Sequence, residues 1–237
     1  MNDLSCWETK FKSCCYSERL LKKLLLLNET ATTKIDILEI KKAIYYARKY
    51  HGHQKRESGE PYYSHPIEVA YMIADYSFKP DILVTSILHD TIEDTELTKE
   101  TITCIFDQNI ANQVDALTRL KIDRKISSIE IIKLLWIQKN SDDLLLVKYF
   151  DRVHNILTIK AKSPEKILKI IEETLTQFIS LGIYFKSKIP EILMIEEQLI
   201  QLCYQNIILK QQSPSLELIL DNFQLPSLTS QNEKFQN

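Results

Sequence analysis

Residues 82–98 read ILVTSILHDTIEDTELT, an apolar run that ends in His89-Asp90 and continues into Glu93-Asp94. Four ionisable groups within six residues are unusual here, because apolar runs usually end in one or two solvated charges. His89 and Glu93 are four residues apart, as are Asp90 and Asp94, so each pair would share a face if one helix continued through them. The stretch therefore predicts a buried helix whose end carries a polar site.

The rest of the chain also reads as helix. Apolar side chains recur at three- and four-residue steps in residues 35–50. Further helices are expected in residues 66–76, 98–106, 111–120, 129–138, 144–159, 164–180 and 190–210, with a polar connection at 121–128 and a Leu-rich helix before residue 34. Only 3 of the 237 residues are Gly, too few for the turns of a β-sandwich or for a Gly-rich phosphate loop. We expect an all-α fold in which residues 51–64, HGHQKRESGEPYYS, form a loop.

Composition excludes several classes of protein. The chain has 30 Lys and Arg against 32 Asp and Glu, which argues against a strongly basic nucleic-acid module. Its five cysteines are scattered and form no CxxC pair, so neither a disulfide framework nor a cysteine zinc site is expected. The apolar stretch 20–27 contains two lysines and is too short to span a bilayer. We expect a cytoplasmic protein that binds neither nucleic acid nor membrane.

A second acidic signal lies in residues 144–159, LLLVKYFDRVHNILTI. Asp151 follows Val147 by four residues and so continues the apolar face of this helix. A carboxylate there must be paired or metal-bound, because an isolated buried carboxylate is costly. His65 stands at the start of another helix, directly before Pro66.

Together, His65, His89, Asp90 and Asp151 would form a site with two nitrogen and two oxygen ligands. Such a set suits Mn²⁺ or Fe²⁺, with Zn²⁺ as a further option. Water on the ion would be acidified and would attack phosphorus, while Glu93 and Asp94 would move protons or orient that water. Taken singly, the histidines could be capping or surface residues, the paired acids a solvated turn, and Asp151 the partner of Arg152. Their order, each at the end of an apolar segment, favours the metal site.

The motifs HP, HDxxEDT and DRxHNxxT occur in this order in the segments RESGEPYYSHPIEVAYMIAD, ILHDTIEDTELT, VDALTRL and VKYFDRVHNILTI. The set resembles HD-domain metal-dependent phosphohydrolases, and most closely the hydrolase domain of RelA/SpoT-type proteins, from about residue 45 to about residue 177. The resemblance implies a helical HD-domain bundle that holds one Mn²⁺ and converts the guanosine polyphosphates ppGpp and pppGpp to GDP or GTP by removing the 3′-pyrophosphate. About 55 residues follow Gly182, too few for a synthetase domain, so a hydrolase-only enzyme similar to the small alarmone hydrolases is implied.

The resemblance also implies roles for individual residues. They are, as metal ligands, His65, His89, Asp90 and Asp151; as the pair that activates water, Glu93 and Asp94; against the guanine base, Arg56; at the sugar and phosphate, Asn155 and Thr158; and in the pocket wall, Ser58, Tyr62 and Lys148. Glu57 stands where many relatives carry Lys, and Leu157 where they often carry Arg. With these positive charges missing, two alternatives stay open: an HD phosphohydrolase for another nucleotide, and a catalytically weak remnant that binds alarmone.

The expected organisation has four parts: an N-terminal helical extension (1–33), the HD phosphohydrolase domain (34–182), a short C-terminal helical extension (183–220) and a disordered tail (221–237). The last helices either complete the domain or provide a homodimer surface. The expected ligand is a small guanosine polyphosphate.

Overall fold

The computed structural model describes residues 6–118, 125–137, 142–185 and 189–208. Over these ranges the chain is helical, with short loops that include an isolated bridge between Lys55 and Pro61, and it contains no strand, so the all-α prediction is confirmed. The helices are α1 (Trp7–Lys10), α2 (Cys15–Thr30), α3 (Ile37–His51), α4 (Ser64–Ile73), α5 (Pro80–Leu88), α6 (Thr91–Asp94), α7 (Lys99–Ile105), α8 (Gln108–Leu117), α9 (Ser128–Ile137), α10 (Asp142–Leu157), α11 (Pro164–Glu173), α12 (Ile179–Phe185) and α13 (Glu191–Ile208), with a 3₁₀ turn η1 (Ile159–Ala161) and a π-helical turn η2 (Thr174–Phe178).

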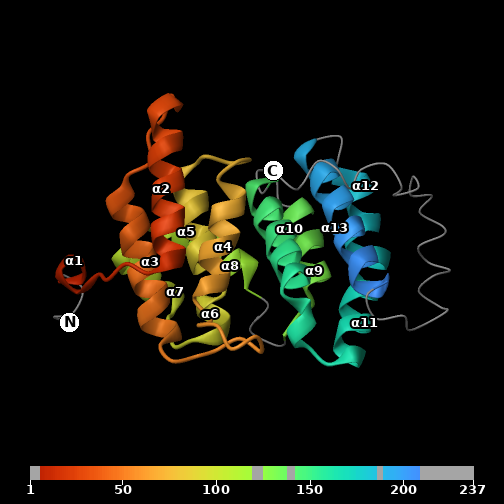
Figure 1. Ribbon diagram of the computed structural model, residues 1–237. Helices are drawn as coiled ribbons and strands as arrows, with labels where there is room; N and C mark the ends of the chain where they lie inside the picture. Colours follow the sequence, from red (N-terminus) through yellow and green to blue (C-terminus); the bar gives the residue numbers. More distant parts are fainter. Residues whose placement is uncertain (1–5, 119–124, 138–141, 186–188, 209–237) are drawn as a thin grey trace.

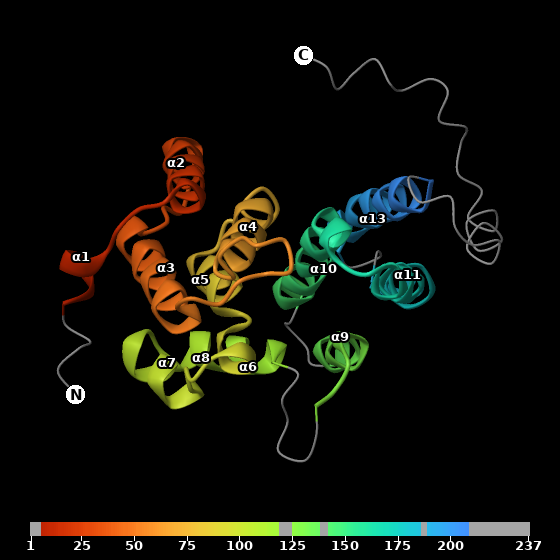
Figure 2. The same cartoon turned by 60° about the horizontal axis from the view of Figure 1, so that its bottom comes forward.

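Helix α10 connects the two sides of the molecule. It packs against α4 on one side and against α9 and α13 on the other. Helix α4 packs in turn against α2 and α5, and α5 packs against α3 and α8. The views in Figure 1 and Figure 2 show α10 between the group α2–α8 and the group α9, α11 and α13.

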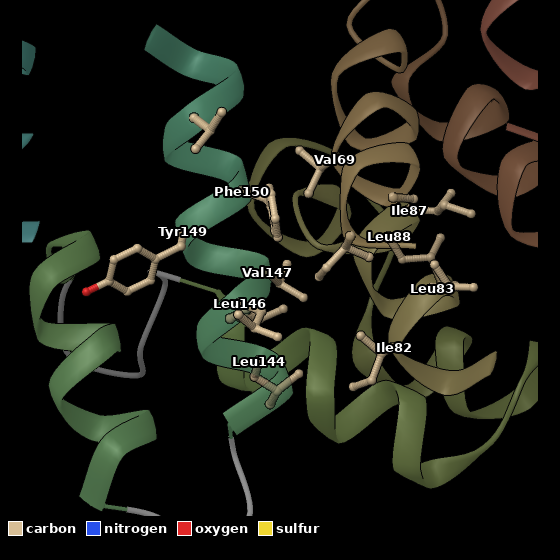
Figure 3. Packing of buried hydrophobic residues seen from close by; sticks show 14 of the residues in the cluster. Val69, Ile82, Leu83, Ile87, Leu88, Leu144, Leu146, Val147, Tyr149 and Phe150 are labelled. Atoms are coloured by element: carbon tan, nitrogen blue, oxygen red, sulfur yellow. The ribbon is translucent and has the colours of Figure 1, made fainter. Parts of the chain in front are cut away.

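The central position of α10 follows from its sequence. A helix that is apolar on most sides must be buried on most sides, and the residues from Leu144 to Phe150 are all buried. Figure 3 shows Val147 and Phe150 on the side that faces the helix carrying Val69, and Tyr149 on the opposite side. Polar residues placed further along α10 are therefore held between elements from both sides.

Helix α5 begins with Pro80 at its first position, where a missing N–H costs nothing. The residues Ile82–Leu88 are all buried, as the apolar run predicts. The helix ends at His89, its C-cap, and α6 begins two residues later at Thr91, whose hydroxyl donates to the carbonyl of Leu88 at 2.6 Å. The condition for shared helical faces is therefore not met, because no single helix runs through the acidic stretch.

The Leu-rich N-terminal helix belongs to the same core. Helix α2 packs against α3 and α4, with Leu20 and Leu24 fully buried. Lys23 adds a surface ion pair with Asp75, with 2.6 Å between Nζ and Oδ2. The helix expected at 164–180 is divided into α11, η2 and α12.

Some expectations fall outside the described residues. The tail 221–237 lies wholly outside the described residues. The connection 121–128 and the extension 183–220 lie partly outside them. The domain boundaries stay predictions. Among the described helices, none combines the length and apolar character that crossing a membrane requires.

Truncation of α2 tests its place in the core. Leu24→Ala should lower the free energy of unfolding by about 2–5 kcal/mol, because it leaves a cavity at a fully buried position. Leu26→Ala is the matched control on the same helix, where the side chain is 64% exposed, and should change stability by less than about 0.5 kcal/mol. Urea unfolding monitored by circular dichroism measures both values. Equal effects of the two variants would show that α2 does not pack as described.

Candidate metal and substrate site

Three helices bring a compact group of ligand-type side chains together. His65 lies in the first turn of α4, His89 caps the end of α5, and Asp151 lies in α10. One ring nitrogen from each histidine and one carboxylate oxygen of Asp151 all lie within 4.8 Å of one another. Both histidines are buried, so this group could hold a metal ion out of bulk solvent.

Asp90 completes the cluster from the turn between α5 and α6. Its Oδ1 lies 2.9 Å from Nε2 of His89, and its Oδ2 lies 3.5 Å from Nε2 of His65. Asp151 Oδ1 lies 3.0 Å from His65 Nε2 and 4.0 Å from His89 Nε2. The Nε2 atoms of both rings thus face two carboxylates, as the predicted set of two nitrogens and two oxygens requires.

The hydrogen bonding of His89 fits a metal ligand. Its Nδ1 lies 2.8 Å from the carbonyl oxygen of Ser86, and because that oxygen can only accept, Nδ1 carries a proton. In the neutral ring Nε2 then carries the lone pair. This buried atom has no hydrogen-bond partner among the described residues, since its approach to Asp90 is not aligned as a hydrogen bond. A backbone carbonyl that fixes the ring through its other nitrogen is the usual support for a metal-bound histidine.

His65 has a comparable support. Its Nδ1 lies 2.8 Å from Nδ1 of His154. Burial, together with the neighbouring His65 and Arg56, lowers the pKa of His154 to about 3, so His154 is neutral and can accept a hydrogen bond from His65 Nδ1. In the tautomer with its proton on Nδ1, Nε2 of His65 would be available to an ion; without an ion, Nε2 lies 3.0 Å from Oδ1 of Asp151 and donates to it when it carries the proton.

The two carboxylates, whose side chains are 16% and 17% exposed, stay ionised despite this partial burial. Burial alone would raise the pKa of Asp151, but the hydrogen bond with His65 and the charge of Lys148, 3.9 Å away, outweigh it and hold the pKa well below the ordinary value. Asn155 also donates to Asp151, with 2.7 Å between Nδ2 and Oδ1. Burial would raise the pKa of Asp90 too; without an ion, however, burial alone would lower the pKa of His89 but the charge of Asp90 raises it, and the protonated ring lowers the pKa of Asp90 instead. Two anions beside two imidazoles form a site that attracts a cation, so the residues present fit a divalent metal.

A cavity of about 470 Å³ opens beside the cluster. Its lining includes the predicted residues Arg56, Tyr62, His65, Asp90, Glu93, Asp94, Lys148, Asp151 and Asn155. His89 lies buried behind this surface. Ser58 is exposed and its hydroxyl lies 3.4 Å from Glu60, so the structure does not bring it into the lining formed by the described residues.

Arg56 ties the loop before α4 to the end of α10. Its guanidinium donates to Oδ1 of Asn155 at 2.9 Å and to Oγ1 of Thr158 at 3.2 Å. Thr158 in turn donates to the carbonyl of His154 at 2.9 Å. Arg56 therefore contacts two predicted substrate residues from the end of α10, of which Asn155 lines the cavity and Thr158 lies beside it outside the described lining.

Glu93 and Asp94, predicted as the pair that activates water, have different partners. Glu93 lies 2.8 Å from Nζ of Lys125. Asp94 accepts a hydrogen bond of 2.6 Å from the hydroxyl of Tyr62. Burial raises the pKa of Asp94 above that of an ordinary carboxyl, and the Tyr62 hydrogen bond opposes part of this rise.

The two departures from the family pattern have structural explanations. Glu57 pairs with two lysines near α11, at 2.9 Å from Lys166 and 3.7 Å from Lys162. The hydrogen bond with Lys166 and the charge of Lys162 lower the pKa of Glu57. Leu157 is 51% exposed and lines a separate hollow between α4, α10 and α13. The absence of a positive charge at this position therefore does not affect the cavity described above.

Several residues around the cavity were not anticipated. Arg152 and Lys162 line it and add positive charge, and Arg152 also pairs with Glu173 at 3.0 Å. Arg152 directly follows Asp151 in the DRxHN motif, which could have indicated it. Lys162 has no signal in the sequence, because its position depends on the turn η1 that follows α10.

Comparison with known proteins relates these features to a family. The HD domain family model matches residues 43–182. The chain is 37% identical over 163 residues to the GTP pyrophosphokinase rsh of Brucella ovis, which covers 66% of this chain and 22% of that protein. It is 36% identical over 139 residues to a guanosine-3′,5′-bis(diphosphate) 3′-pyrophosphohydrolase of Aquifex aeolicus, with 58% and 20% covered. The chain thus spans about a fifth of the length of these curated relatives.

A solved structure, described as a metazoan ortholog of SpoT that hydrolyzes ppGpp, aligns with a TM-score of 0.47 and 19% identity over 81% of this chain and 96% of that one. The family match is the stronger finding, since it covers more than half of the chain and includes the whole cluster of His65, His89, Asp90 and Asp151. This chain belongs to the HD domain family and is related to the RelA/SpoT (p)ppGpp hydrolase domains.

Proposed function

We propose that this chain is a Mn²⁺-dependent hydrolase that removes the 3′-pyrophosphate of ppGpp and pppGpp and leaves GDP or GTP. The observation that carries the proposal is the cluster of two buried histidines and two largely buried, ionised carboxylates, which opens into a cavity whose lining includes five cationic and six acidic side chains. A relative at 36% identity is named a guanosine-3′,5′-bis(diphosphate) 3′-pyrophosphohydrolase, which supports this choice of substrate.

His65, His89, Asp90 and Asp151 would hold one divalent ion. When bound, such an ion stabilises negative charge on a phosphoryl oxygen and lowers the pKa of water. Asp94 lines the same cavity, and its raised pKa makes it a stronger proton acceptor than an ordinary carboxylate. Glu93 beside it would orient the attacking water.

The substrate would be held by charge at the cavity and by the arginine at its edge. Arg56 is fixed by Asn155 and Thr158, so its planar guanidinium is available to stack on a guanine base. Lys55, Lys148, Arg152 and Lys162 also line the cavity and would bind phosphate oxygens. Because the whole chain carries a formal charge of only −2, these local cations must attract the polyanion.

A second candidate is an HD phosphohydrolase that acts on a different nucleotide. The specific observation is Glu57, a carboxylate in the cavity lining whose partners, Lys162 and Lys166, are also candidates for binding phosphate. The remaining alternative is a binding protein without catalytic activity. Such a protein would bind the nucleotide but form no product from it.

Incubation of the purified protein with ppGpp and Mn²⁺ should release pyrophosphate and GDP. His89→Ala should reduce this rate at least ~100-fold. Removing a partner that only supports a metal ligand typically costs about 10–100-fold in activity, and removing the ligand itself should cost more. Chromatographic separation of the products, with a panel of other nucleotides run in parallel, distinguishes the candidates. If the metal-loaded protein binds ppGpp but releases no pyrophosphate, the binding protein would be favoured.

Mn²⁺ should raise the midpoint of thermal unfolding, because an ion that binds the folded state stabilises it by about 2.7 kcal/mol at 100 times its dissociation constant. Asp151→Asn should abolish the shift by removing a buried anionic ligand. Glu100→Gln, an exposed carboxylate change in α7, should keep the shift. A shift that survives Asp151→Asn would place the ion elsewhere.

The pH dependence of kcat should depend on Asp94 and its hydroxyl partner. Asp94 accepts a proton only when ionised, so kcat should fall as the pH drops through its raised pKa. The Tyr62 hydroxyl stabilises the ionised form, so Tyr62→Phe should raise that pKa further and move the acid limb to higher pH. Tyr63→Phe is the control, since that ring lies under Arg48 instead. An acid limb that stays in place in Tyr62→Phe would exclude Asp94 as the titrating group.

A further inference from the structure

A closed series of contacts joins Asp94 to three residues at and after the end of α3. Nε2 of Gln54 donates to the carbonyl oxygen of Asp94 at 2.7 Å. Oε1 of Gln54 lies 2.8 Å from Nδ1 of His51. The ring of His51 stacks on that of Tyr62, with centroids 4.8 Å apart and planes inclined by 25°. The hydroxyl of Tyr62 then donates to Oδ2 of Asp94, so the series returns to the residue where it began.

His51 is the buried member of this series. It is 1% exposed and lies at the last position of α3. Since the amide oxygen of Gln54 can only accept, Nδ1 of His51 is the donor. Burying an imidazole is costly unless it is hydrogen-bonded, so the bond to Gln54 fixes the orientation of the ring. That orientation presents the flat face of His51 to Tyr62.

The backbone brings the four residues together. Gly52 caps α3 with a φ of 51°, a conformation that favours glycine, and turns the chain back on itself. The N–H of Gln54 donates to the carbonyl of His51, and the N–H of Tyr62 donates to the carbonyl of Gln54, both at 2.9 Å. The loop is therefore shaped so that His51, Gln54 and Tyr62 face the same end of α6.

We propose that His51 and Gln54 are positioning residues that hold Asp94 in the place required for water activation. The inference rests on the proposed function, because that function gives Asp94 its role. Gln54 holds the backbone of Asp94, and His51 acts on the carboxylate through the Tyr62 ring. Both contacts, one to the backbone and one to the carboxylate of Asp94, are needed because α6 has only four residues, too few to fix its own geometry.

Kinetics of three variants test the inference. Gln54→Leu removes the hold on the backbone at an exposed position where folding should be unaffected. His51→Phe keeps a flat ring against Tyr62 and removes the donor to Gln54. Each should lower kcat by ~10–100-fold, because a displacement of about 1 Å costs that much, with KM for ppGpp and the affinity for Mn²⁺ unchanged. The double variant should lose little more than the worse single variant, because both act through one carboxylate.

His53→Phe is the matched control, since His53 is an exposed histidine two residues away in the same loop. It should leave kcat and KM unchanged. Losses that multiply in the double variant, a change confined to KM, or an unaltered kcat in Gln54→Leu would overturn the positioning role.

Unfolding measurements separate this inference from the proposed function. His51→Asn keeps a donor near Gln54 and removes the ring, whereas Tyr62→Phe removes only the hydroxyl that binds Asp94. If the His51 ring orients that hydroxyl, the two changes in the free energy of unfolding should be non-additive. Additive changes would overturn the inference even in an active enzyme. Absence of pyrophosphate release by the wild-type chain together with non-additive changes would overturn the proposed function alone.

Discussion

The burial of ionised carboxylates among apolar helices is the constraint on which the rest of this structure depends. Asp151 lies on α10, a helix otherwise packed on both sides by apolar side chains, and an isolated charge there would be prohibitive. Its charge is tolerated because His65 and Asn155 hydrogen-bond to it and Lys148 lies nearby. The helices that carry these partners must therefore meet at one point. A cation would bind most favourably at the same point, because the two carboxylates lie there.

The distribution of positive charge follows from the same constraint. A chain that is nearly neutral overall has no general positive field, so any attraction for an anion depends on where its individual cations lie. The loop before α4, α10 and the turn η1 each contribute one or more to the cavity wall. The negative charge of Glu57 does not neutralise all of these cations, because Glu57 pairs only with Lys162 and Lys166 among the described residues.

Much of the cluster could be predicted from the sequence because each of its members ends or continues an apolar pattern. Asp151 was identified by its spacing from Val147, and His89 by the run before it. The break between α5 and α6 was not foreseen, since it depends on the contact of Thr91 with the end of α5. Lys125 and Lys162 carry long exposed side chains whose partners are set by tertiary packing, so periodicity contains no information about them.

The position of the acidic pair beside the cluster shows how a glycine-poor helical protein can build a precise site. A glycine loop would cradle phosphate with its backbone, whereas this site is built from side chains at helix ends, whose accuracy depends on what holds each end. α4, α5 and α10 are held by the core, but α6 is too short to be held by its own hydrogen bonds. The loop after α3 therefore has to be structured as firmly as a helix, with a buried histidine at the end of α3 that stacks on Tyr62 and a Tyr62 hydroxyl that donates to the carboxylate of Asp94.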